Sequence, residues 1–181
     1  MAKASGNTRK CPQIGGGNLV YTAEQKDALQ NYINGSDVNY YARKGKLTKD
    51  AKGLDELMKS ASSVMTVFRG VPIDMDEDYS KAIFNAKVGD TLTDKGFLST
   101  SLSLEAAESH VEEEYQSVIF KINVPKGSKL IDVNDTYSKA FNKKNVYHME
   151  QEVLLHRNTK LKVTKTENKN GTKYIHANLL E

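Results

Sequence analysis

The sequence contains little cysteine and no long apolar segment. Cys11 is the only cysteine among 181 residues, which excludes a disulfide within the chain and a zinc site built on cysteine. We expect its thiol to be exposed to solvent rather than catalytic. No apolar run approaches the roughly 20 residues that cross a bilayer, and the N-terminus lacks the apolar stretch of a cleavable secretory signal. We therefore expect no membrane contact and a cytoplasmic site of action, in the producing cell or in a target cell.

Most of the chain also lacks an excess of charge of one sign. The net charge is +3, from 26 basic and 23 acidic residues. Residues 1–18 carry Lys3, Arg9 and Lys10 and no acid, so removing these three leaves 23 basic against 23 acidic residues. Proteins that bind nucleic acid usually present a clustered basic surface. A nucleic-acid partner is therefore not expected.

The composition fits one globular domain of ordinary size, since 38% of the residues are hydrophobic and 27% are charged. We expect residues 1–18, which include three consecutive glycines, to form a flexible basic tail and residues 19–181 to form a single domain. The spacing of the histidines, which are His110, His148, His156 and His176, produces no His-x-x-x-His pair. No metal site is predicted.

The hydrophobic period changes along the chain. Helical spacing predicts helices over 22–35, 38–43 and 54–60, the first opened by a capping box between Thr22 and Gln25. Strand-like patterns follow, with helices between some of them. The strands are expected at 64–68, 91–100, 117–124, 129–133, 150–156, 160–166 and 172–179, and the helices at 78–84 and 104–115. Asn170-Gly171 predicts a hairpin turn, and the polar segment 134–149 predicts a functional loop. Helices first and antiparallel strands later indicate an α+β domain.

Three short motifs follow one another in this pattern. They are Val-Phe-Arg-Gly at 67–70, Phe-Leu-Ser-Thr-Ser at 97–101 and Glu-Gln-Glu at 150–152. Their order and setting resemble the Arg, Ser-Thr-Ser, Glu-x-Glu signature of the ADP-ribosyltransferase exoenzyme family, which includes bacterial toxins, phage enzymes and vertebrate ectoenzymes. The resemblance covers about residues 20–181. It implies N-terminal helices packed on a mixed, mostly antiparallel β core of two sheets, and NAD as a co-substrate.

The Glu-x-Glu spacing has a chemical meaning of its own. Side chains two residues apart on a strand share a face, so Glu150 and Glu152 are expected to point together, roughly 6.6 Å apart. Two carboxylates at that distance can serve different partners, as in inverting glycoside hydrolysis, where the separation is about 6.5–9.5 Å. One carboxylate can stabilise a sugar cation while the other activates a nucleophile. The alternative is a pair of solvated strand glutamates.

The resemblance assigns a role to each catalytic candidate. Glu152 would bind the ribose 2′-hydroxyl and stabilise the positive charge that develops as nicotinamide leaves. Glu150 would orient and deprotonate the acceptor, and a glutamate at this position goes with arginine as the acceptor in the family. Ser99 would hold Glu152 in its working rotamer and border the nicotinamide pocket.

The same resemblance implies a set of NAD-binding residues. Arg69 would bind the phosphates and the nicotinamide ribose, since a guanidinium matches phosphate oxygens bidentately; a structural ion pair is the alternative. Gly70 would allow a close backbone approach. Ser99, Thr100 and Glu152 complete the set, although a turn-capping role is also open for Thr100.

Segment 135–149 corresponds to the substrate-recognition loop of the family. Tyr147 is our first candidate for an aromatic residue that contacts the acceptor, and Phe141 is the second. Packing of the loop against the domain is the alternative for both side chains.

The sequence thus predicts a mono-ADP-ribosyltransferase that modifies an arginine of a target protein and releases nicotinamide. Three alternatives stay open: an NAD glycohydrolase, a transferase with another acceptor, and a non-catalytic module that binds NAD. A phage enzyme or a bacterial toxin or effector would fit the resemblance, and such a protein could have an inhibitor or immunity partner.

Overall fold

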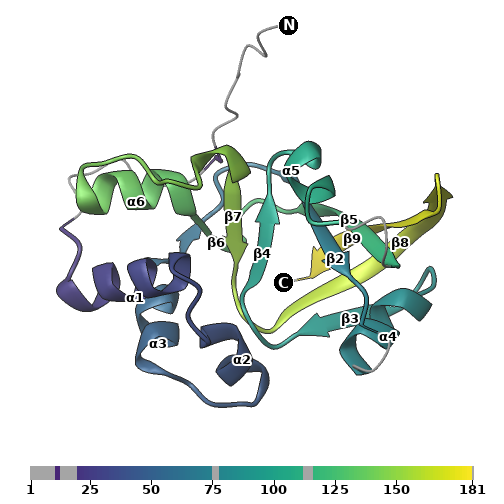
Figure 1. The fold of residues 1–181 in the computed structure, drawn as a ribbon, viewed down its shortest axis with the longest axis horizontal. Coiled ribbons are helices and arrows are strands. Elements are labelled where there is room, and N and C mark those ends of the chain that lie inside the picture. The colour runs from purple at the N-terminus through teal and green to yellow at the C-terminus, as the bar shows by residue number, and fades with distance from the viewer. Residues whose placement is uncertain (1–10, 13–19, 75–77, 112–115, 181) are drawn as a thin grey trace, which may run out of the picture.

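Helices come first in the chain and strands follow, as the sequence pattern predicts (Figure 1). The computed structural model describes residues 11–12, 20–74, 78–111 and 116–180. The expected tail lies mostly outside these ranges. The elements are α1 (Ala23–Ile33), α2 (Val38–Arg43), α3 (Lys49–Leu57), β1 (Lys59–Ser60), β2 (Met65–Pro72), α4 (Asp78–Asn85), β3 (Thr91–Asp94), β4 (Leu98–Ser101), α5 (Leu104–Glu108), β5 (Ser117–Val124), β6 (Lys129–Asp132), α6 (Val133–Phe141), the 3-10 helix η1 (His148–Glu150), β7 (Glu152–Leu155), β8 (Thr159–Lys169) and β9 (Thr172–Leu180).

The described strands are all linked by hydrogen bonds, in the order β1-β6-β7-β4-β2-β5-β9-β8-β3. Within that set β5 and β9 are the one parallel pair, so the core is mixed and mostly antiparallel as expected. Two sheets were expected, whereas the described strands form one hydrogen-bonded set. That set is nearly divided in two, because β2 and β4 share a single register pair, Phe68 with Ser101. This narrow junction divides the strands into two sections, and the candidate motifs lie beside it.

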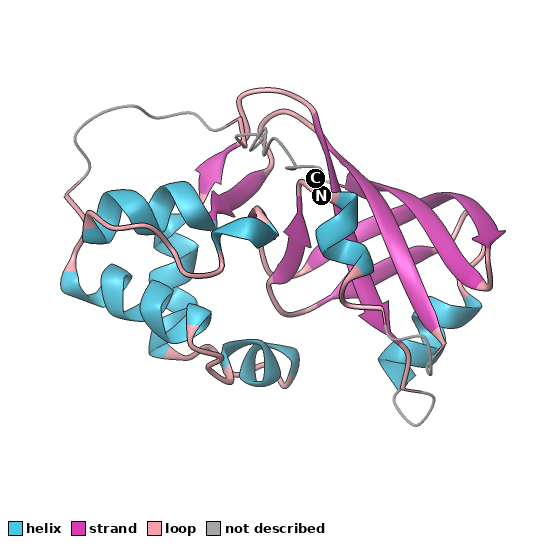
Figure 2. Cartoon of the chain, turned by 45° about the horizontal axis from the view of Figure 1, so that its top comes forward, coloured by secondary structure: helices cyan, strands magenta, loops and turns pink. Residues whose placement is uncertain are grey.

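Two hydrophobic cores lie on opposite faces of the strands next to the junction. The first core packs β2, β5, β8 and β9 together with α4, while the second packs α1, α2, α3 and α6 against β6 and β7. Figure 2 shows these four helices gathered on one side of the molecule. Strand β7 serves both cores, since Val153 and Leu155 belong to the first and Leu154 to the second. Its alternation thereby fixes which way each neighbouring side chain points.

The predicted capping box and the predicted hairpin turn are both confirmed. Thr22 and Gln25 form both hydrogen bonds of the capping box that opens α1. Asn170 and Gly171 adopt φ values of 50° and 84°, as a two-residue hairpin turn between β8 and β9 requires. No described helix is long and apolar enough to span a membrane.

The polar segment after β6 is not a continuous loop, so the loop prediction is wrong for residues 134–141, which belong to α6 (Val133–Phe141). Asp132 caps its N-terminus by accepting a hydrogen bond from the backbone of Asp135, at 2.9 Å. Asn142 ends the helix in the left-handed conformation with φ 52°. Buried positions recur at helical spacing along it, at Val133, Thr136, Tyr137 and Ala140, but polar residues between them obscure the pattern. The irregular loop is therefore limited to about residues 142–151.

Two further expectations are corrected. Helix α3 begins at Lys49 rather than near Leu54, because the side chain of Thr48 accepts a hydrogen bond from the backbone of Ala51 and caps an earlier turn. Cys11 is buried, not exposed: only 8% of it is accessible, and its sulfur lies 3.7 Å from that of Met65.

Candidate active site

Strands β4 and β7 bring two of the three motifs together. They pair antiparallel, with Ser101 opposite Glu152 and Ser99 opposite Leu154. Residues directly opposite each other share a face of the sheet, so Ser99, Ser101 and Glu152 all lie on the face that Leu154 turns to the helical core. This face looks toward α1.

The carboxylate of Glu152 is held by two hydroxyl groups. Ser99 donates to its Oε1 at 2.7 Å, and Tyr32, from α1, donates to the same oxygen at 2.5 Å. No described residue donates to Oε2, so this oxygen is available to a ligand. The sequence predicts the contact with Ser99 but not the one with Tyr32, because 120 residues separate Tyr32 from Glu152 and nothing local marks the tyrosine.

Burial governs the protonation of this pair. It raises the pKa of Glu152 above its ordinary value, and the negative charge of Glu150 adds to the rise, while the hydrogen bonds from Tyr32 and Ser99 oppose it. The pKa of Tyr32 lies well above its ordinary value, because of burial and of the Glu152 charge beside it. Tyr32 therefore remains a hydrogen-bond donor throughout the physiological range of pH.

Arg69 reaches across the junction between β2 and β4. Strand alternation places it on the same face of β2 as Val67 and Val71, which are both buried. One of its terminal nitrogens, Nη1, donates to the backbone oxygen of Ser99 at 2.8 Å. Its Nε is buried and has no hydrogen-bond partner among the described residues. An unpaired donor on a buried cation is costly unless a ligand satisfies it, so this guanidinium suits an anionic ligand such as a phosphate.

A cavity of about 370 Å³ lies in front of these groups. It joins the three motifs to the last turn of α5. The residues that line it are Phe68, Arg69, Gly70, Pro72, Ser99, Thr100, Ser101, Ala106, Ala107, Ser109, His110, Glu150 and Glu152. We call it the first cavity. Its volume lies within the range of about 300–1,000 Å³ that is typical of small-molecule sites.

Glycine is required at position 70 by the helix that passes over it. A Cβ built there would lie 2.0 Å from the backbone oxygen of Ala107 and 3.3 Å from the Cβ of His110. Any side chain would push α5 away from β2 and change the wall of the first cavity. The close approach is thus made by the protein's own backbone.

Glu150 does not lie on a strand, so the prediction that it shares a strand face with Glu152 is wrong. It ends η1, and Gln151 follows in the left-handed conformation with φ 47°. Ser101 holds this turn by donating to the backbone oxygen of Glu150 at 2.5 Å. The two carboxylates are nevertheless close enough for the charge of Glu150 to raise the pKa of Glu152, and both line the first cavity.

A second cavity, of about 310 Å³, is also lined by the two carboxylates. Its remaining wall comes from the C-terminal end of α1, the turn after it and the loop before η1. The lining residues are Tyr32, Ile33, Gly35, Ser36, Asn145, Tyr147, Glu150 and Glu152. Glu150 and Glu152 thus line both cavities.

The two aromatic candidates for acceptor contact lie in different places. Tyr147 is 54% exposed and lines the second cavity. Phe141 instead ends α6 and packs against the ring of Tyr137, with centroids 4.7 Å apart, on the edge of the helical core. It lines neither cavity and packs against the helical core. Thr100 also has a structural contact, since it is buried and its hydroxyl donates to the backbone oxygen of Val153 at 2.5 Å.

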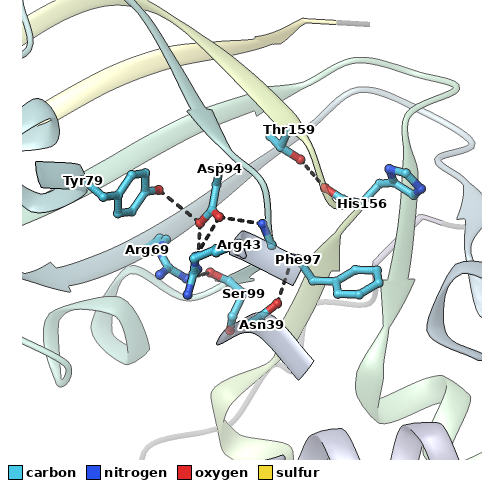
Figure 3. A network of polar contacts seen from close by, with 10 residues as sticks. Asn39, Arg43, Arg69, Tyr79, Asp94, Phe97, Ser99, His156 and Thr159 are labelled. Carbon is cyan, nitrogen blue, oxygen red and sulfur yellow. Dashed lines mark hydrogen bonds and ion pairs between the residues drawn. The ribbon is translucent and has the colours of Figure 1, made fainter. Parts of the chain in front are cut away.

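A polar cluster that the sequence does not reveal borders Arg69. Asp94, at the end of β3, forms a bidentate ion pair with Arg43 of α2, with distances of 2.8 and 2.9 Å. Tyr79 of α4 donates to the same carboxylate at 3.1 Å. Figure 3 shows Asp94 between these two partners, with Arg69 and Ser99 beside them.

The cluster fixes the approach to β4. Asp94 also accepts from the backbone of Gly96 at 2.8 Å, and Asn39 of α2 accepts from the backbone of Phe97 at 2.8 Å. Helix α2 is thereby attached to the turn that precedes Ser99. Short-range sequence patterns do not indicate this polar cluster, because its residues come from α2, α4 and β3.

The comparisons with known proteins agree with this geometry. The family model for the ADP-ribosyltransferase exoenzyme matches residues 6–180. The chain therefore belongs to the ADP-ribosyltransferase exoenzyme family. No curated protein matches it in sequence.

Three of the solved structures that share the fold illustrate the likeness. Plx2a, an ADP-ribosyltransferase toxin from Paenibacillus larvae, is 20% identical, with a TM-score of 0.66 over 88% of this chain and 87% of its own. C3stau2 from S. aureus, solved with NAD, is 18% identical, with a TM-score of 0.64 over 89% and 88%. Vis from Vibrio splendidus, solved with agmatine, is 18% identical, with a TM-score of 0.64 over 89% and 76%. At such identities the likeness establishes the fold.

Proposed function

We propose that the protein transfers ADP-ribose from NAD to an arginine side chain of a target protein. One observation supports this most strongly: Glu152 is fixed by Tyr32 and Ser99 through a single oxygen and leaves the other oxygen available beside the first cavity. A rigid carboxylate in a partly dry site stabilises a cation that forms in front of it, with little reorganisation.

In the proposed reaction the bond between the ribose C1′ and the nicotinamide nitrogen breaks, and its electron pair leaves with nicotinamide. The ribose becomes oxocarbenium-like, and Oε2 of Glu152 binds its 2′-hydroxyl. A guanidinium nitrogen of the acceptor then forms a bond to C1′ and loses one proton. The products are an ADP-ribosylated arginine, nicotinamide and a proton.

Glu150 would take up that proton. It faces both cavities, so it can contact an acceptor that approaches the ribose from the side away from nicotinamide. A carboxylate beside a guanidinium orients it by charge and accepts its proton when the new bond forms. The role does not need the shared strand face that the sequence suggested.

NAD would lie in the first cavity. The buried Nε of Arg69 offers a donor to a phosphate or a ribose oxygen, and Gly70 keeps the cavity wall close to the β2 backbone. C3stau2, which shares the fold, was solved with NAD, and that supports the assignment. We further propose that residues 19–181 act as one catalytic domain, since the family match runs almost to the end of the chain.

The test is incubation of the protein with labelled NAD and cell lysate, followed by mapping of the modified residue. We expect labelled arginine with the wild type and none with Glu152→Ala. Glu56→Ala, which removes an exposed carboxylate of α3 outside both cavities, is the matched control and should label normally. Labelling that persists in Glu152→Ala would contradict the mechanism, and labelling of other residues alone would contradict the acceptor.

Glu150→Ala separates transfer from hydrolysis. We expect this variant to lose transfer and to retain release of nicotinamide in the absence of acceptor. Unchanged transfer would refute the role of Glu150. Release of nicotinamide by the wild type with no labelled protein would instead identify an NAD glycohydrolase.

A further inference from the structure

The strand section on one side of the junction has a face that does not point into a hydrophobic core. This section consists of β2, β5, β9, β8 and β3, which form the right-hand part of Figure 2. Alternation along β5 sends Phe120 into the first core, so Lys121 points the other way and is exposed. We call this side of the section the outer face. Helix α5 packs on one end of it, over Gly70, whereas Thr91 and Thr93 of β3, at the far end, are exposed.

Four lysines lie close together on the outer face. Lys160 and Lys162 are two residues apart on β8, so they share a face of the strand, and both are exposed. Lys121 and Lys165 are both register partners of His176 on β9, one from each neighbouring strand, so their backbones lie about 10 Å apart. The four lysines thus span β5, β9 and β8.

A β-bulge brings Lys165 into this group. The register of β8 shifts between Val163 and Lys165, so that Lys165 lies opposite His176. His176 lies between two buried residues of β9 and therefore belongs to the outer face. Unbroken alternation would have sent Lys165 to the buried side together with Val163. The bulge instead turns its side chain outward, where it is 58% exposed.

Most of this positive charge is not compensated by a carboxylate of the described residues. Glu167 of β8 pairs with Lys165 at 2.7 Å. Lys162 donates to a backbone oxygen, which is neutral, and Lys121 and Lys160 form no ion pair or hydrogen bond within the described part of the chain. The chain beyond residue 18 carries equal numbers of basic and acidic residues. The outer face therefore concentrates positive charge that is balanced elsewhere in the domain.

The outer face begins at the rim of the first cavity. Phe68 of β2 lines that cavity and lies directly opposite Lys121 in the pair formed by β2 and β5. The other exposed side chains of the face are hydroxyls and amides, and they include Thr66, Thr91, Thr93, Asn123 and Asn178. A polar, positively charged surface of this kind suits a hydrated contact with another macromolecule.

We propose that the outer face is a docking surface for the target protein, and that it binds an acidic patch on that protein. This inference rests on the function proposed above. Opposite charges on two protein surfaces raise the rate of encounter and set the orientation of the partners. A target docked there lies beside the cavity in which NAD would bind, so docking and transfer can take place in one complex.

Two variants of equal net charge test the proposal. The outer-face variant carries three charge reversals: Lys121→Glu, Lys160→Glu and Lys162→Glu. The control variant carries three reversals at exposed lysines outside the outer face and both cavities: Lys52→Glu, Lys126→Glu and Lys129→Glu. Each variant is incubated with labelled NAD and either cell lysate or agmatine, which carries an alkyl guanidinium without a protein surface.

We expect the outer-face variant to label protein about tenfold more slowly than the wild type at low salt, because steering by charge is lost. Its kcat/KM for agmatine should stay within about twofold of the wild type, and the control variant should resemble the wild type with both acceptors. Labelling of protein by the wild type should fall toward that of the outer-face variant near 1 M salt, where the Debye length is about 3 Å.

A second set of substitutions guards against misfolding of the outer-face variant, which circular dichroism would reveal. Lys→Gln at the same three positions removes the charges without adding acids and should give a smaller loss of protein labelling. Labelling of protein at the wild-type rate by both sets would overturn the inference with the proposed function intact. If the wild type then binds a labelled oligonucleotide and the outer-face variant does not, the face binds nucleic acid instead. An equal loss with agmatine would also overturn the inference, since the substitutions would then act on the active site. A wild type that labels neither protein nor agmatine would contradict the proposed function itself.

Discussion

The hydroxyl of Tyr32 on α1 donates a 2.5 Å hydrogen bond to the carboxylate of Glu152 at the start of β7. The bond joins the first described helix to a strand 120 residues further along the chain. It also reinforces the bond from Ser99 to the same oxygen. Glu152 thus has its orientation set from two different elements, and only one of them is visible as a motif.

Tyr32→Phe should lower kcat of the proposed reaction about tenfold, because the hydrogen bond to a charged group is lost and the ring is kept. Since that bond lowers the pKa of Glu152, the acid limb of the pH–rate profile should also move to higher pH. Tyr21→Phe removes another buried hydroxyl, one without a partner among the described residues, and is the control. A normal profile in Tyr32→Phe would show that Ser99 alone positions the carboxylate.

Activity of the wild type should fall on the acid side at a pH above the ordinary glutamate pKa of about 4.3. The proposed mechanism needs the charged form of Glu152, and burial raises the pKa of that group. A plot of kcat/KM for NAD against pH measures this limb. A limb at or below the ordinary value would mean that Glu152 is better solvated than its burial indicates.

Glu152→Gln should lose activity by roughly 100-fold to 1000-fold but unfold at a higher temperature than the wild type at neutral pH. A carboxyl whose pKa is raised by folding makes the folded state less stable as the pH rises from its unfolded pKa through its folded one. The penalty is complete once the pH exceeds the folded pKa of Glu152, and it is absent in acid. Calorimetry at neutral pH and near pH 3 measures the difference, which should vanish at the lower pH. A variant less stable than the wild type at neutral pH would contradict this sign.

Gly70→Ala should destabilise the protein by about 1–3 kcal/mol and weaken NAD binding. The added Cβ meets the backbone oxygen of Ala107, which cannot move without α5. Urea unfolding measures the first effect and calorimetric titration with NAD the second. A variant with unchanged stability would show that α5 does not pack as closely on β2 as described.

Cys11 should resist alkylation in the folded protein. Burial, together with the negative charges of Asp132 and Asp135, raises the pKa of its thiol to about 12. At pH 8 the thiolate fraction, and hence the rate with iodoacetamide, should be about a thousandfold lower than in urea-unfolded protein. Mass spectrometry of samples taken over time measures both rates. Comparable rates would place the cysteine in solvent, as the sequence suggested.

Sequence patterns predicted most of the helices and strands. They also predicted which motif residues lie close together in the sheet. The alternation of β5 was clear because one face of the strand is buried along its length, and the capping box at Thr22 is a local signal. The contact between Ser99 and Glu152 could be predicted from the resemblance to the family. These features depend on short-range chemistry or on a known motif order.

The missed features depend on long-range packing. Helix α6 was hidden because its buried stripe includes Thr136 among polar residues. The position of Glu150 was missed because a left-handed residue, Gln151, ends the turn just before β7. Tyr32 carries no motif, and it contacts Glu152 only because α1 packs beside β7.

Strand β7 sends Val153 and Leu155 into one core and Leu154 into the other. A slip of one residue would exchange these sides and turn Glu152 away from its two hydroxyl donors, so the arrangement cannot loosen gradually. We therefore expect partly unfolded forms to be inactive and every folded molecule to be competent without an activating rearrangement of this strand. The fraction of active molecules in a sample should therefore equal its folded fraction.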